Sequence, residues 1–580
     1  MNSWDRLVIT DVGSTTTKAL YFEKQLQHWQ LIARGEAATT VEAPDADVMV
    51  GVIRSIEMVE QRCNKPLLRE TDQGKVLNDI PYLSTSSAGG GLQMVVCGHV
   101  GRISAESAQR AALGGGAVLL DVFAADDGRS LFQRMERLRT LRPDMILLSG
   151  GVDGAEPGSF MIEMCDFIRS AHPKPKFGYQ YTLPIIYAGT SKAVDLVEDL
   201  LGDQFSLKIV DNLRPSFQEE NLTPTREAIH ELFIEHVMSH APGYGRLKAM
   251  TAMDLLPTPT AVGDILCLYA TRTKKNILCV DIGGATTDVF SVVKGQYVRT
   301  VSANYGMSYS IGNVATSAGL DSIARWIPNH QLNNDDLQER IGNKLIYPTS
   351  IPATLKELYM EQAAGREALR LSFLDHKAIA KIQKPKGLFS GTLTETEKEI
   401  HIDDFDMIIG SGGVLSNAPH RGQAAAMLLD AFQPVGITEL MVDSIFMLPH
   451  LGAFSHADEA GAIEILERDC LIPLGTSLVP LGFGSLGQLA ITIEGKTNTG
   501  RLLKQTGNWG ELLSIPLQSN ETALLNISVH NGARWSADQN KVSVKGGLTG
   551  IMIDLRGRPL NQEQWPNQTY QNQWLHTLCQ

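Results

Sequence analysis

The sequence predicts an α/β protein with two lobes that begin with the same hairpin, an additional α/β module and a small β domain at the C-terminus. Three observations support this prediction. The phrase DVGSTTTKAL at residues 11–20 returns as DIGGATTDVF at residues 281–290. Strand and helix patterns alternate between residues 100 and 215. Short strand patterns separated by Gly, Asn and Asp follow residue 480.

The chain has 580 residues, which is enough for about three to five domains. We expect boundaries where the pattern of hydrophobic residues changes. The first lobe is expected at 1–100, the α/β module at 101–220, the second lobe at 221–480 and the β domain at 481–580.

Composition excludes several classes of protein. The net charge of −13 argues against a general nucleic-acid binder, because phosphate binding needs an excess of basic side chains. No apolar stretch approaches the roughly 20 residues that span a bilayer, and the first residues show no signal-peptide pattern. The seven cysteines have no Cys-x-x-Cys spacing, which favours a reducing cytosol over a disulfide or zinc framework. We therefore expect a cytoplasmic protein.

The first copy of the repeated phrase predicts a phosphate-binding turn. The apolar run Leu7–Ile9 predicts a strand that ends near Asp11, and a second strand resumes at Ala19. Small turn residues let backbone N–H groups approach an anion, threonine hydroxyls add donors, and a lysine neutralises charge. The candidate ligand-binding residues of this turn are Gly13, Ser14, Thr15, Thr16 and Lys18.

The second copy aligns with the first without gaps. Asp281 matches Asp11, and the candidate binding residues are Gly283, Gly284, Thr286 and Thr287. A carboxylate beside a phosphate is repelled unless a cation such as Mg²⁺ lies between them. The pair of turns therefore predicts a metal–polyphosphate site in which Asp11 and Asp281 position the metal and the attacking water. Asp288, which occupies the position of Lys18, fits a solvated turn residue as well as a catalytic one.

A third motif, MIIGSGGVLSNAP at residues 407–419, predicts a strand, a glycine-rich turn and a helix. Its glycines would let an adenosine ring lie against the backbone, with helix N-terminal amides near the phosphates. The candidate residues are Gly410, Ser411, Gly412 and Gly413. A similar Ser-Gly-Gly at 149–151 shows that this pattern alone is weak, and we assign that copy to the α/β module.

The order of the two hairpin phrases and the glycine-rich motif resembles the actin, Hsp70 and sugar-kinase superfamily of ATPases. This resemblance implies a two-lobed actin/Hsp70-like fold, ATP as ligand and Mg²⁺ as its metal. It also implies that Asp11–Lys18 is the first phosphate motif, Asp281–Asp288 the second and Gly410–Gly413 the adenosine motif.

Longer stretches resemble one family, the MutL-type accessory proteins of adenosylcobalamin-dependent glutamate mutase. The stretches are SSAGGGLQMVV (86–96), RPDMILLSGGVDGA (142–155), PIIYAG (184–189), PTPTAV (257–262), CVDIGGATTDVFSV (279–292), GMSYSIGNV (306–314) and GIMIDLRGRPL (550–560). The resemblance implies an ATP-dependent reactivase that binds subunits of a cobalamin-dependent mutase and releases damaged cobalamin, without a role for nucleic acid or membrane.

Other functions remain compatible with the sequence. A small-molecule kinase of the same superfamily needs a catalytic aspartate between the phosphate motifs, and Asp153 and Asp264 are candidates. An electron-transferring activator of 2-hydroxyacyl-CoA dehydratases would need cluster-binding cysteines, which the cysteine spacing does not supply. A nucleotide-dependent scaffold without hydrolysis is the third alternative. His450 and His456 are expected to be core or surface residues rather than metal ligands.

Overall fold

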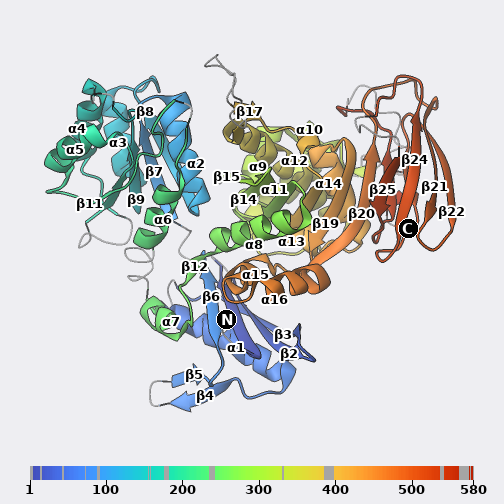
Figure 1. The fold of residues 1–580 in the computed structure, drawn as a ribbon, viewed down its shortest axis with the longest axis horizontal. Coiled ribbons are helices and arrows are strands. Elements are labelled where there is room, and N and C mark those ends of the chain that lie inside the picture. Colours follow the sequence, from blue (N-terminus) through green and yellow to red (C-terminus); the bar gives the residue numbers. More distant parts are fainter. Residues whose placement is uncertain are drawn as a thin grey trace. The chain divides into compact units, whose positions relative to one another are not determined.

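The computed structural model describes residues 4–13, 16–41, 45–71, 74–87, 92–154, 156, 158–175, 182–217, 219–233, 242–302, 304–328, 332–383, 397–535, 541–560, 574, 577 and 578. These residues form two compact units (Figure 1). Unit 1 comprises Met1–Ile265 and Leu448–Leu466, and unit 2 comprises Leu266–Gln383, Glu397–Met447 and Glu467–Gln580. Within the described part of the chain, no helix combines the length and apolarity that crossing a membrane requires.

Unit 1 begins with a five-stranded sheet in the order β12-β6-β1-β2-β3. Strands β1, β2 and β3 form an antiparallel meander, and β6 and β12 continue the sheet in parallel with β1. The core side chains of β1 come from the apolar run that predicted it, and Leu7, Val8 and Ile9 are fully buried. The strands are β1 (Arg6–Val12), β2 (Thr16–Gln25), β3 (His28–Ala38), β6 (Tyr82–Ser86) and β12 (Leu256–Pro257).

Helix α1 (Val48–Cys63) packs on this sheet. Asp47 caps its N-terminus by accepting a hydrogen bond from the backbone N–H of Met49 at 3.0 Å. Val48, Val52, Ile56 and Val59 recur on one face at helical spacing and are fully buried. The helix ends where Asn64 adopts a left-handed conformation. A small hairpin follows, formed by β4 (Leu68–Thr71) and β5 (Gly74–Leu77).

The next segment of unit 1 is the predicted α/β module, which we define as residues 92–233. Its five strands are all parallel, in the order β8-β7-β9-β10-β11. They are β7 (Leu92–Gly98), β8 (Ala117–Ala124), β9 (Met145–Ser149), β10 (Pro184–Tyr187) and β11 (Ser206–Ile209). The helices are α2 (Glu106–Gly114), α3 (Leu131–Leu141), α4 (Ser159–Ala171), α5 (Val194–Leu201) and α6 (Thr223–Leu232).

Both faces of the module's sheet are covered by helices (Figure 1). Val95 and Cys97 of β7 pack in one apolar cluster with side chains of α3, α4 and α5. Met94 and Val96 of the same strand pack in a second cluster with α2 and α6. This alternation explains why the strands of the module read as continuous apolar runs, as parallel strands buried on both faces do.

The chain then returns to the first sheet of unit 1. Helix α7 (Tyr244–Met250) precedes the two-residue strand β12, which pairs in parallel with β6. The sequence predicts helices across residues 224–270 and misses this strand, because two residues carry no periodic pattern. Helix α8 (Thr258–Thr273) follows, and its residues from Leu266 onward belong to unit 2. Helices α15 (Leu448–Ser455) and α16 (Glu459–Ile465) complete unit 1.

Unit 2 is built on an eight-stranded sheet in the order β15-β14-β13-β18-β19-β20-β26-β23. Strands β13, β14 and β15 form an antiparallel meander, and β18 and β19 continue the sheet in parallel with β13. The strands are β13 (Ile277–Ile282), β14 (Thr287–Val293), β15 (Gln296–Ser302), β18 (Met407–Ser411), β19 (Gly436–Asp443), β20 (Leu471–Val479), β23 (Leu512–Ile515) and β26 (Ile551–Asp554).

Helices and a short hairpin complete this part of unit 2. The longest helix, α12, starts with a capping box between Thr354 and Glu357 and packs on β14 and β15. The elements are α9 (Ile311–Ala318), α10 (Leu320–Ala324), α11 (Asn334–Ile346), α12 (Leu355–Ile379), α13 (Gly413–Ser416), α14 (Arg421–Phe432), β16 (Lys381–Gln383) and β17 (Glu397–Glu399).

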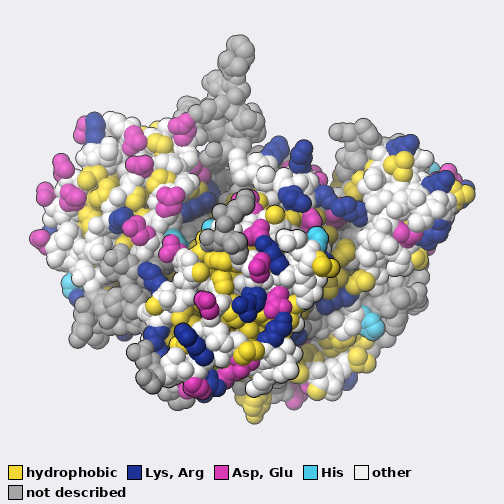
Figure 2. Space-filling model, turned by 60° about the horizontal axis from the view of Figure 1, so that its bottom comes forward, with side chains coloured by type: hydrophobic (Ala, Val, Ile, Leu, Met, Phe, Trp, Pro, Cys, Tyr) yellow, Lys and Arg dark blue, Asp and Glu magenta, His cyan; other side chains and the backbone are white. Residues whose placement is uncertain are grey.

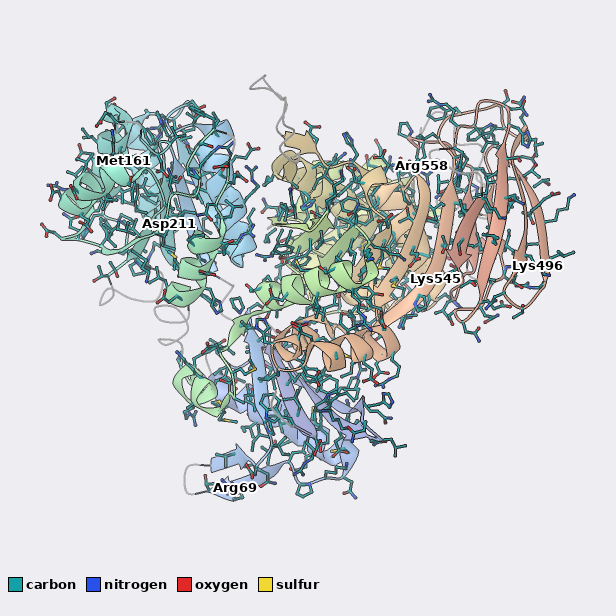
Figure 3. All side chains as sticks on the ribbon, in the orientation of Figure 1. Arg69, Met161, Asp211, Lys496, Lys545 and Arg558 are labelled. Atoms are coloured by element: carbon teal, nitrogen blue, oxygen red, sulfur yellow. The ribbon has the colours of Figure 1, made fainter. Side chains whose placement is uncertain are left out.

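The C-terminal strands contribute to two different sheets. Strands β23 and β26 extend the eight-stranded sheet, whereas the other four form a separate antiparallel sheet in the order β22-β21-β24-β25. The four are β21 (Leu489–Thr497), β22 (Leu502–Asn508), β24 (Thr522–Val529) and β25 (Lys541–Lys545). One face of this sheet is buried and the other carries exposed side chains such as Lys496 and Lys545 (Figure 3).

A buried ion-pair cluster ties β26 to the helices of unit 2. Asp430 of α14 accepts from Arg366 Nε of α12 at 2.7 Å and from Arg556 at 2.8 Å. Asp554 of β26 accepts from Arg558 at 2.6 Å and also pairs with Arg556. Although burial opposes the charge, the two guanidinium groups hold the pKa of Asp554 well below its usual range.

The two units share one strand order. Each contains an antiparallel meander of three strands followed by two parallel strands, β1-β2-β3 with β6 and β12 in unit 1, and β13-β14-β15 with β18 and β19 in unit 2. The predicted α/β class with an actin/Hsp70-like arrangement is therefore confirmed. The domain boundaries expected from the sequence stay a prediction.

Candidate functional site

The first hairpin turn lies between β1 and β2, as its sequence predicts. Asp11 stands opposite Lys18 in the antiparallel register, and Gly13 N–H donates to the Thr16 carbonyl at 3.1 Å. A Cβ on Gly13 would lie 2.7 Å from that carbonyl oxygen, so the turn needs glycine there. The hydroxyl of Thr39, just after β3, donates to the Gly13 carbonyl at 2.8 Å. Ser14 and Thr15 lie outside the described residues.

The Asp11 carboxylate is almost fully buried, at 2% exposure. Its Oδ1 accepts from the hydroxyl of Thr85 in β6 at 2.8 Å and from that of Thr258 in α8 at 2.6 Å. A carboxylate oxygen accepts hydrogen bonds from both hydroxyls, so the two threonines fix its orientation. Sequence reasoning missed both threonines as site residues, although Thr258 lies within the PTPTAV stretch.

Further buried hydroxyls of β1 and β6 form hydrogen bonds close to Asp11 in the first sheet. Thr10 Oγ1 lies 2.5 Å from Tyr82 Oη and 2.8 Å from Ser84 Oγ, and Ser86 Oγ lies 2.7 Å from Tyr244 Oη. Burial raises the pKa of Tyr82 to about 12. The Tyr82 phenol therefore stays neutral at physiological pH and serves as a hydrogen-bonding group.

The second hairpin turn, between β13 and β14, repeats the backbone geometry of the first. Gly283 N–H donates to the Thr286 carbonyl at 2.9 Å. A second segment braces this turn, because Met307 and Ser308 donate their N–H groups to the carbonyls of Gly283 and Gly284 at 2.9 and 2.8 Å. The hydroxyl of Thr287 donates to the Tyr305 carbonyl, so its hydrogen atom is directed at the backbone.

The glycine-rich motif lies beside the second turn. Strand β18 ends at Ser411, which stands opposite Asp281 in the parallel register. Gly412 has a φ of 99°, and a Cβ there would lie 2.2 Å from the Ile282 carbonyl oxygen. Only glycine lets the motif approach the end of β13 this closely. The Ser411 hydroxyl is buried and has no hydrogen-bond partner among the described residues.

Asp443 extends the same edge of unit 2. It ends β19, the strand next to β18, and is fully buried. Its carboxylate accepts from the N–H groups of Met447 and Ile445 at 2.9 and 3.2 Å. The carboxyl ends of β13, β18 and β19 therefore present Asp281, Ser411 and Asp443 in one row, a set that only sheet pairing could reveal.

The family model described as "MutL protein" matches residues 7–470, four fifths of the chain, including both turns and the glycine-rich motif. The chain belongs to the MutL protein family. A curated relative, Protein MutL of Clostridium tetanomorphum, is 26% identical over 494 residues, which cover 80% of this chain and 99% of the relative.

Two solved structures show a distant likeness to this MutL-family chain. Nucleotide-free acetone carboxylase is 12% identical with a TM-score of 0.32, covering 87% of this chain and 80% of its own. The nucleotide-free diol dehydratase-reactivating factor is 9% identical with a TM-score of 0.30, covering 79% of this chain and all of its own.

Asp288, one of the positions left open by the sequence, has a structural partner in this MutL-family chain. Its Oδ1 accepts from Arg299 Nε of β15 at 2.8 Å, and the Arg299 side chain is only 2% exposed. Arg299 also lies over the ring of Phe290, 5.9 Å from its centroid. The ion pair fixes the start of β14 to β15 and explains an acidic residue at the position of Lys18.

The predicted site residues thus gather within each unit of the MutL-family protein. Unit 1 brings together Asp11, Gly13, Thr16 and Lys18, and unit 2 brings together Asp281, the second turn and Gly410–Gly413. The described residues contain no group of three or more His, Cys, Asp or Glu side chains suited to a metal ion. His450 is buried in α15, and His456 pairs with Asp264 at 2.8 Å, so neither takes the setting of a metal ligand.

Proposed function

We propose that this protein binds and hydrolyses Mg²⁺-ATP and acts as a reactivating chaperone of a cobalamin-dependent mutase. The observation that carries the nucleotide part is the duplicated turn. Two strands on matching sheets each carry an aspartate one residue before their end, Asp11 and Asp281, beside a turn closed by a glycine N–H and a threonine carbonyl. Such turns present backbone donors to phosphate, and their carboxylates suit a hydrated divalent cation.

The residues present fit a magnesium nucleotide. Asp11 is held by Thr85 and Thr258 through one oxygen, so its orientation does not depend on the ligand. The buried Ser411 hydroxyl, without a partner among the described residues, can supply a hydrogen bond to a bound ligand. Glycine at position 412 keeps side chains away from the surface on which an adenosine would lie.

Each group then has a defined task. Asp11 and Asp281 orient the hydrated metal ion and the water that attacks the γ-phosphate, and Lys18 balances phosphate charge. Mg²⁺, when bound, supplies the positive charge that stabilises the phosphoryl oxygens. The turn amides and the hydroxyl of Thr286 bind phosphate oxygens. Loss of the γ-phosphate removes these contacts, which changes the relative stability of two conformations of the chain.

Sequence similarity to a MutL protein supports the proposed mutase partner. The relative of 26% identity is named Protein MutL and is matched over nearly its whole length. The stretches at 142–155 and 306–314 resemble accessory proteins of glutamate mutase. A chaperone of this kind must bind the inactivated mutase more tightly in one nucleotide state than in the other, since equal affinity shifts nothing.

Paired substitutions test the nucleotide part. Asp11→Asn and Asp281→Asn each remove one carboxylate charge with little change of shape, and each should lower ATP turnover by about a hundredfold or more. If both act on one nucleotide, the double variant should be no slower than the worse single variant. The exposed residues Asp79 and Asp335 provide matched controls, and their Asn variants should hydrolyse ATP normally. Unchanged turnover in Asp281→Asn would exclude the proposed role.

The partner is tested with a native extract. The full chain, held with ATP or with ADP, should capture subunits of a cobalamin-dependent mutase in one nucleotide state more than in the other. Mutase inactivated by bound, damaged cobalamin should regain activity when the protein, ATP and intact coenzyme are added together. If reactivation proceeds equally with Asp281→Asn, ATP hydrolysis is not part of the process.

A further inference from the structure

The α/β module contains a cavity that the proposed nucleotide site does not use. Its volume is about 440 Å³, and it lies at the carboxyl ends of β9, β10 and β11. The residues that line it are Asp153, Gly189, Ser191, Val194, Ile209, Val210, Asp211, Asn212, Pro215 and Asn221. Open parallel sheets bind their ligands at this edge, outside the carboxyl ends of the strands.

Hydrogen bonds fix the loops of this edge to one another. The side-chain amide of Asn212, after β11, donates to the Gly151 carbonyl at 3.1 Å and to Asp153 Oδ1 at 2.9 Å, both after β9. Asp153 N–H donates to the Pro215 carbonyl at 3.0 Å. A Cβ on Gly189, after β10, would lie 2.6 Å from the Gly150 carbonyl oxygen. The rim is therefore preformed by loops that follow three strands.

The chemistry of the lining selects the ligand. Two carboxylates, Asp153 and Asp211, face the cavity, and none of the described residues that line it is Lys, Arg or His. The neighbouring Lys192 is paired with Glu156 at 2.6 Å. Phosphates and other anions are therefore disfavoured, and a ligand must offer O–H or N–H donors. Figure 2 shows further acidic side chains gathered over the module, at the left of the view.

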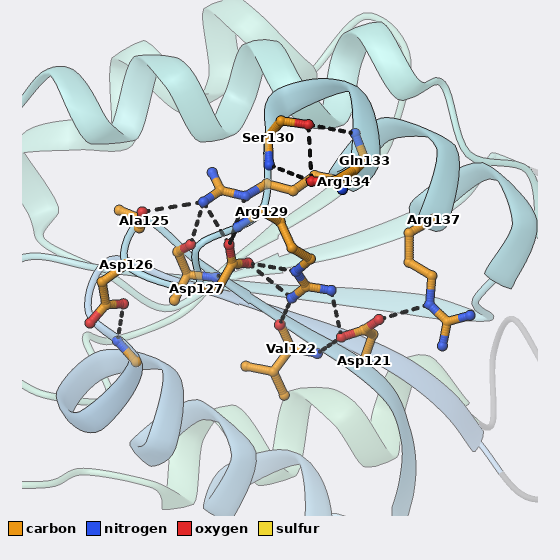
Figure 4. Close-up of polar contacts among 12 residues, drawn as sticks. Asp121, Val122, Ala125, Asp126, Asp127, Arg129, Ser130, Gln133, Arg134 and Arg137 are labelled. Carbon is orange, nitrogen blue, oxygen red and sulfur yellow. Dashed lines mark hydrogen bonds and ion pairs between the residues drawn. The ribbon is translucent and has the colours of Figure 1, made fainter.

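At the other end of the same edge, carboxylates that stabilise the fold of the module are paired with arginines. In the turn between β8 and α3, Asp127 pairs with Arg129 at 2.9 Å and with Arg134 at 2.8 Å (Figure 4). Asp121 pairs with Arg129 and Arg137. Burial opposes the charge of Asp127, but hydrogen bonds from Arg129 and Arg134 lower its pKa. Asp211 is exposed, and its carboxylate has no ion pair or hydrogen bond within the described residues, so it is free to accept from a ligand.

We propose that this cavity binds a ribonucleoside, with the two ribose hydroxyls donating to Asp153 and Asp211. A metal ion or simple amine would leave most of the volume unused. Val194, Ile209 and Pro215 provide apolar walls against which a flat base can pack. This site is independent of the proposed ATP hydrolysis.

Adenosine is the probe, because its diol can be removed without other change. With the full chain kept in excess of a non-hydrolysable ATP analogue, adenosine should bind by calorimetry and protect amides of residues 150–153, 188–194 and 209–215 from hydrogen exchange. 2′,3′-Dideoxyadenosine should bind at least about tenfold more weakly, since it leaves two carboxylates without donors. Equal affinity for both nucleosides, or no binding of adenosine up to about 10 mM, overturns the proposal.

Surface substitutions locate the site. Asp211→Asn should weaken adenosine binding by about tenfold, because a carboxylate accepts a stronger hydrogen bond than an amide does. Asp199→Asn, on an exposed position of α5 outside the lining, should leave the affinity unchanged. Adenosine binding is measured by calorimetry and not by ATP turnover, so failure of the ATPase proposal and failure of this one can be told apart. Insensitivity to Asp211→Asn, or protection outside the three loops, contradicts the assignment.

Discussion

Unit 1 and unit 2 place an aspartate at the end of the same strand but surround it differently. In unit 1, one oxygen of Asp11 is held by the hydroxyls of Thr85 and Thr258. In unit 2, the neighbour of Asp281 across the sheet is Ser411, whose buried hydroxyl has no partner among the described residues. The same backbone arrangement thus carries Asp11, whose orientation is fixed by two hydroxyls, and Asp281, which lies beside the Ser411 hydroxyl.

The crossovers between the parallel strands differ even more. Between β18 and β19, unit 2 has only the helices α13 and α14. Between β6 and β12, unit 1 contains the whole α/β module, with its own sheet and its own cavity. A crossover leaves and re-enters the sheet at fixed points, so its length is free as long as the ends meet the strands. The hairpin turn has the same geometry in both units, whereas the connection between the parallel strands can contain an entire domain.

The largest effect is expected where the two turns differ in charge. Asp288→Ala in unit 2 would leave the buried guanidinium of Arg299 without its carboxylate, at a cost of about 3 kcal/mol. Hydrogen exchange of the amides in β14 and β15 should report this loss as faster local opening. Combining Asp288→Leu with Arg299→Met should recover most of the stability. A cost below about 0.5 kcal/mol for Asp288→Ala would show that the pair is not structural.

The equivalent position in unit 1 sharpens the contrast. Lys18→Ala removes a half-buried side chain at the edge of the first turn, and stability should change by no more than about 0.5 kcal/mol. ATP turnover, however, should fall by about tenfold or more, because the lysine balances phosphate charge in the proposed mechanism. An unfolded variant, or one with full turnover, would contradict this assignment.

The next prediction compares the loss of stability when Gly13 and Gly283 are each replaced by alanine. A Cβ at Gly13 would lie 2.7 Å from the Thr16 carbonyl oxygen, whereas one at Gly283 would lie 3.2 Å from that of Thr286. Gly13→Ala should therefore cost about 2 kcal/mol in local stability, and Gly283→Ala less than about 1 kcal/mol. Exchange of the hairpin amides in each unit measures both values. If Gly283→Ala were the more damaging, the turns would not share the geometry described here.

A further difference between the units depends on pH. His376 of α12 is fully buried between Thr300 Oγ1 at 2.9 Å and Ser291 Oγ at 2.8 Å, and burial lowers its pKa to about 3. The unfolded chain takes up this proton near pH 6.5, so the contribution of His376 is present above that pH and is lost as pH falls toward 3.

Unit 2 should therefore lose about 2 kcal/mol of stability from this group between pH 7 and pH 5. The corresponding helix of unit 1, α1, contains no histidine. Relative to the intrinsic exchange rate at each pH, protection of the amides in β14 and α12 should fall over this range more than protection of those in β2 and α1. A His376→Gln variant should show a weaker pH dependence, and an unchanged dependence would exclude His376 as its source.

Much of the fold could be predicted from local patterns. The apolar runs and glycine turns predicted β1, β13 and β18, and the alternation between residues 100 and 215 predicted a parallel sheet covered by helices. Strand β12 could not be predicted, because its two residues become a strand only by pairing with β6. Strands β23 and β26 looked like parts of a separate β domain, but β26 pairs with β20 and β23 pairs with β26, which places both in the eight-stranded sheet.

The candidate site divides in the same way. Asp11, Asp281 and their turns are set by residues adjacent in the chain, so the repeated phrase determined where the strands end and which backbone amides the turns present. Thr85 and Thr258 lie 74 and 247 residues from Asp11, and no local pattern could assign them to its carboxylate. The sequence alone determined the turns and the charges beside them, because both depend on short-range geometry. Only the tertiary structure decided which side chains hold those charges and where a cavity remains, because sheet pairing brings together segments that the chain keeps far apart.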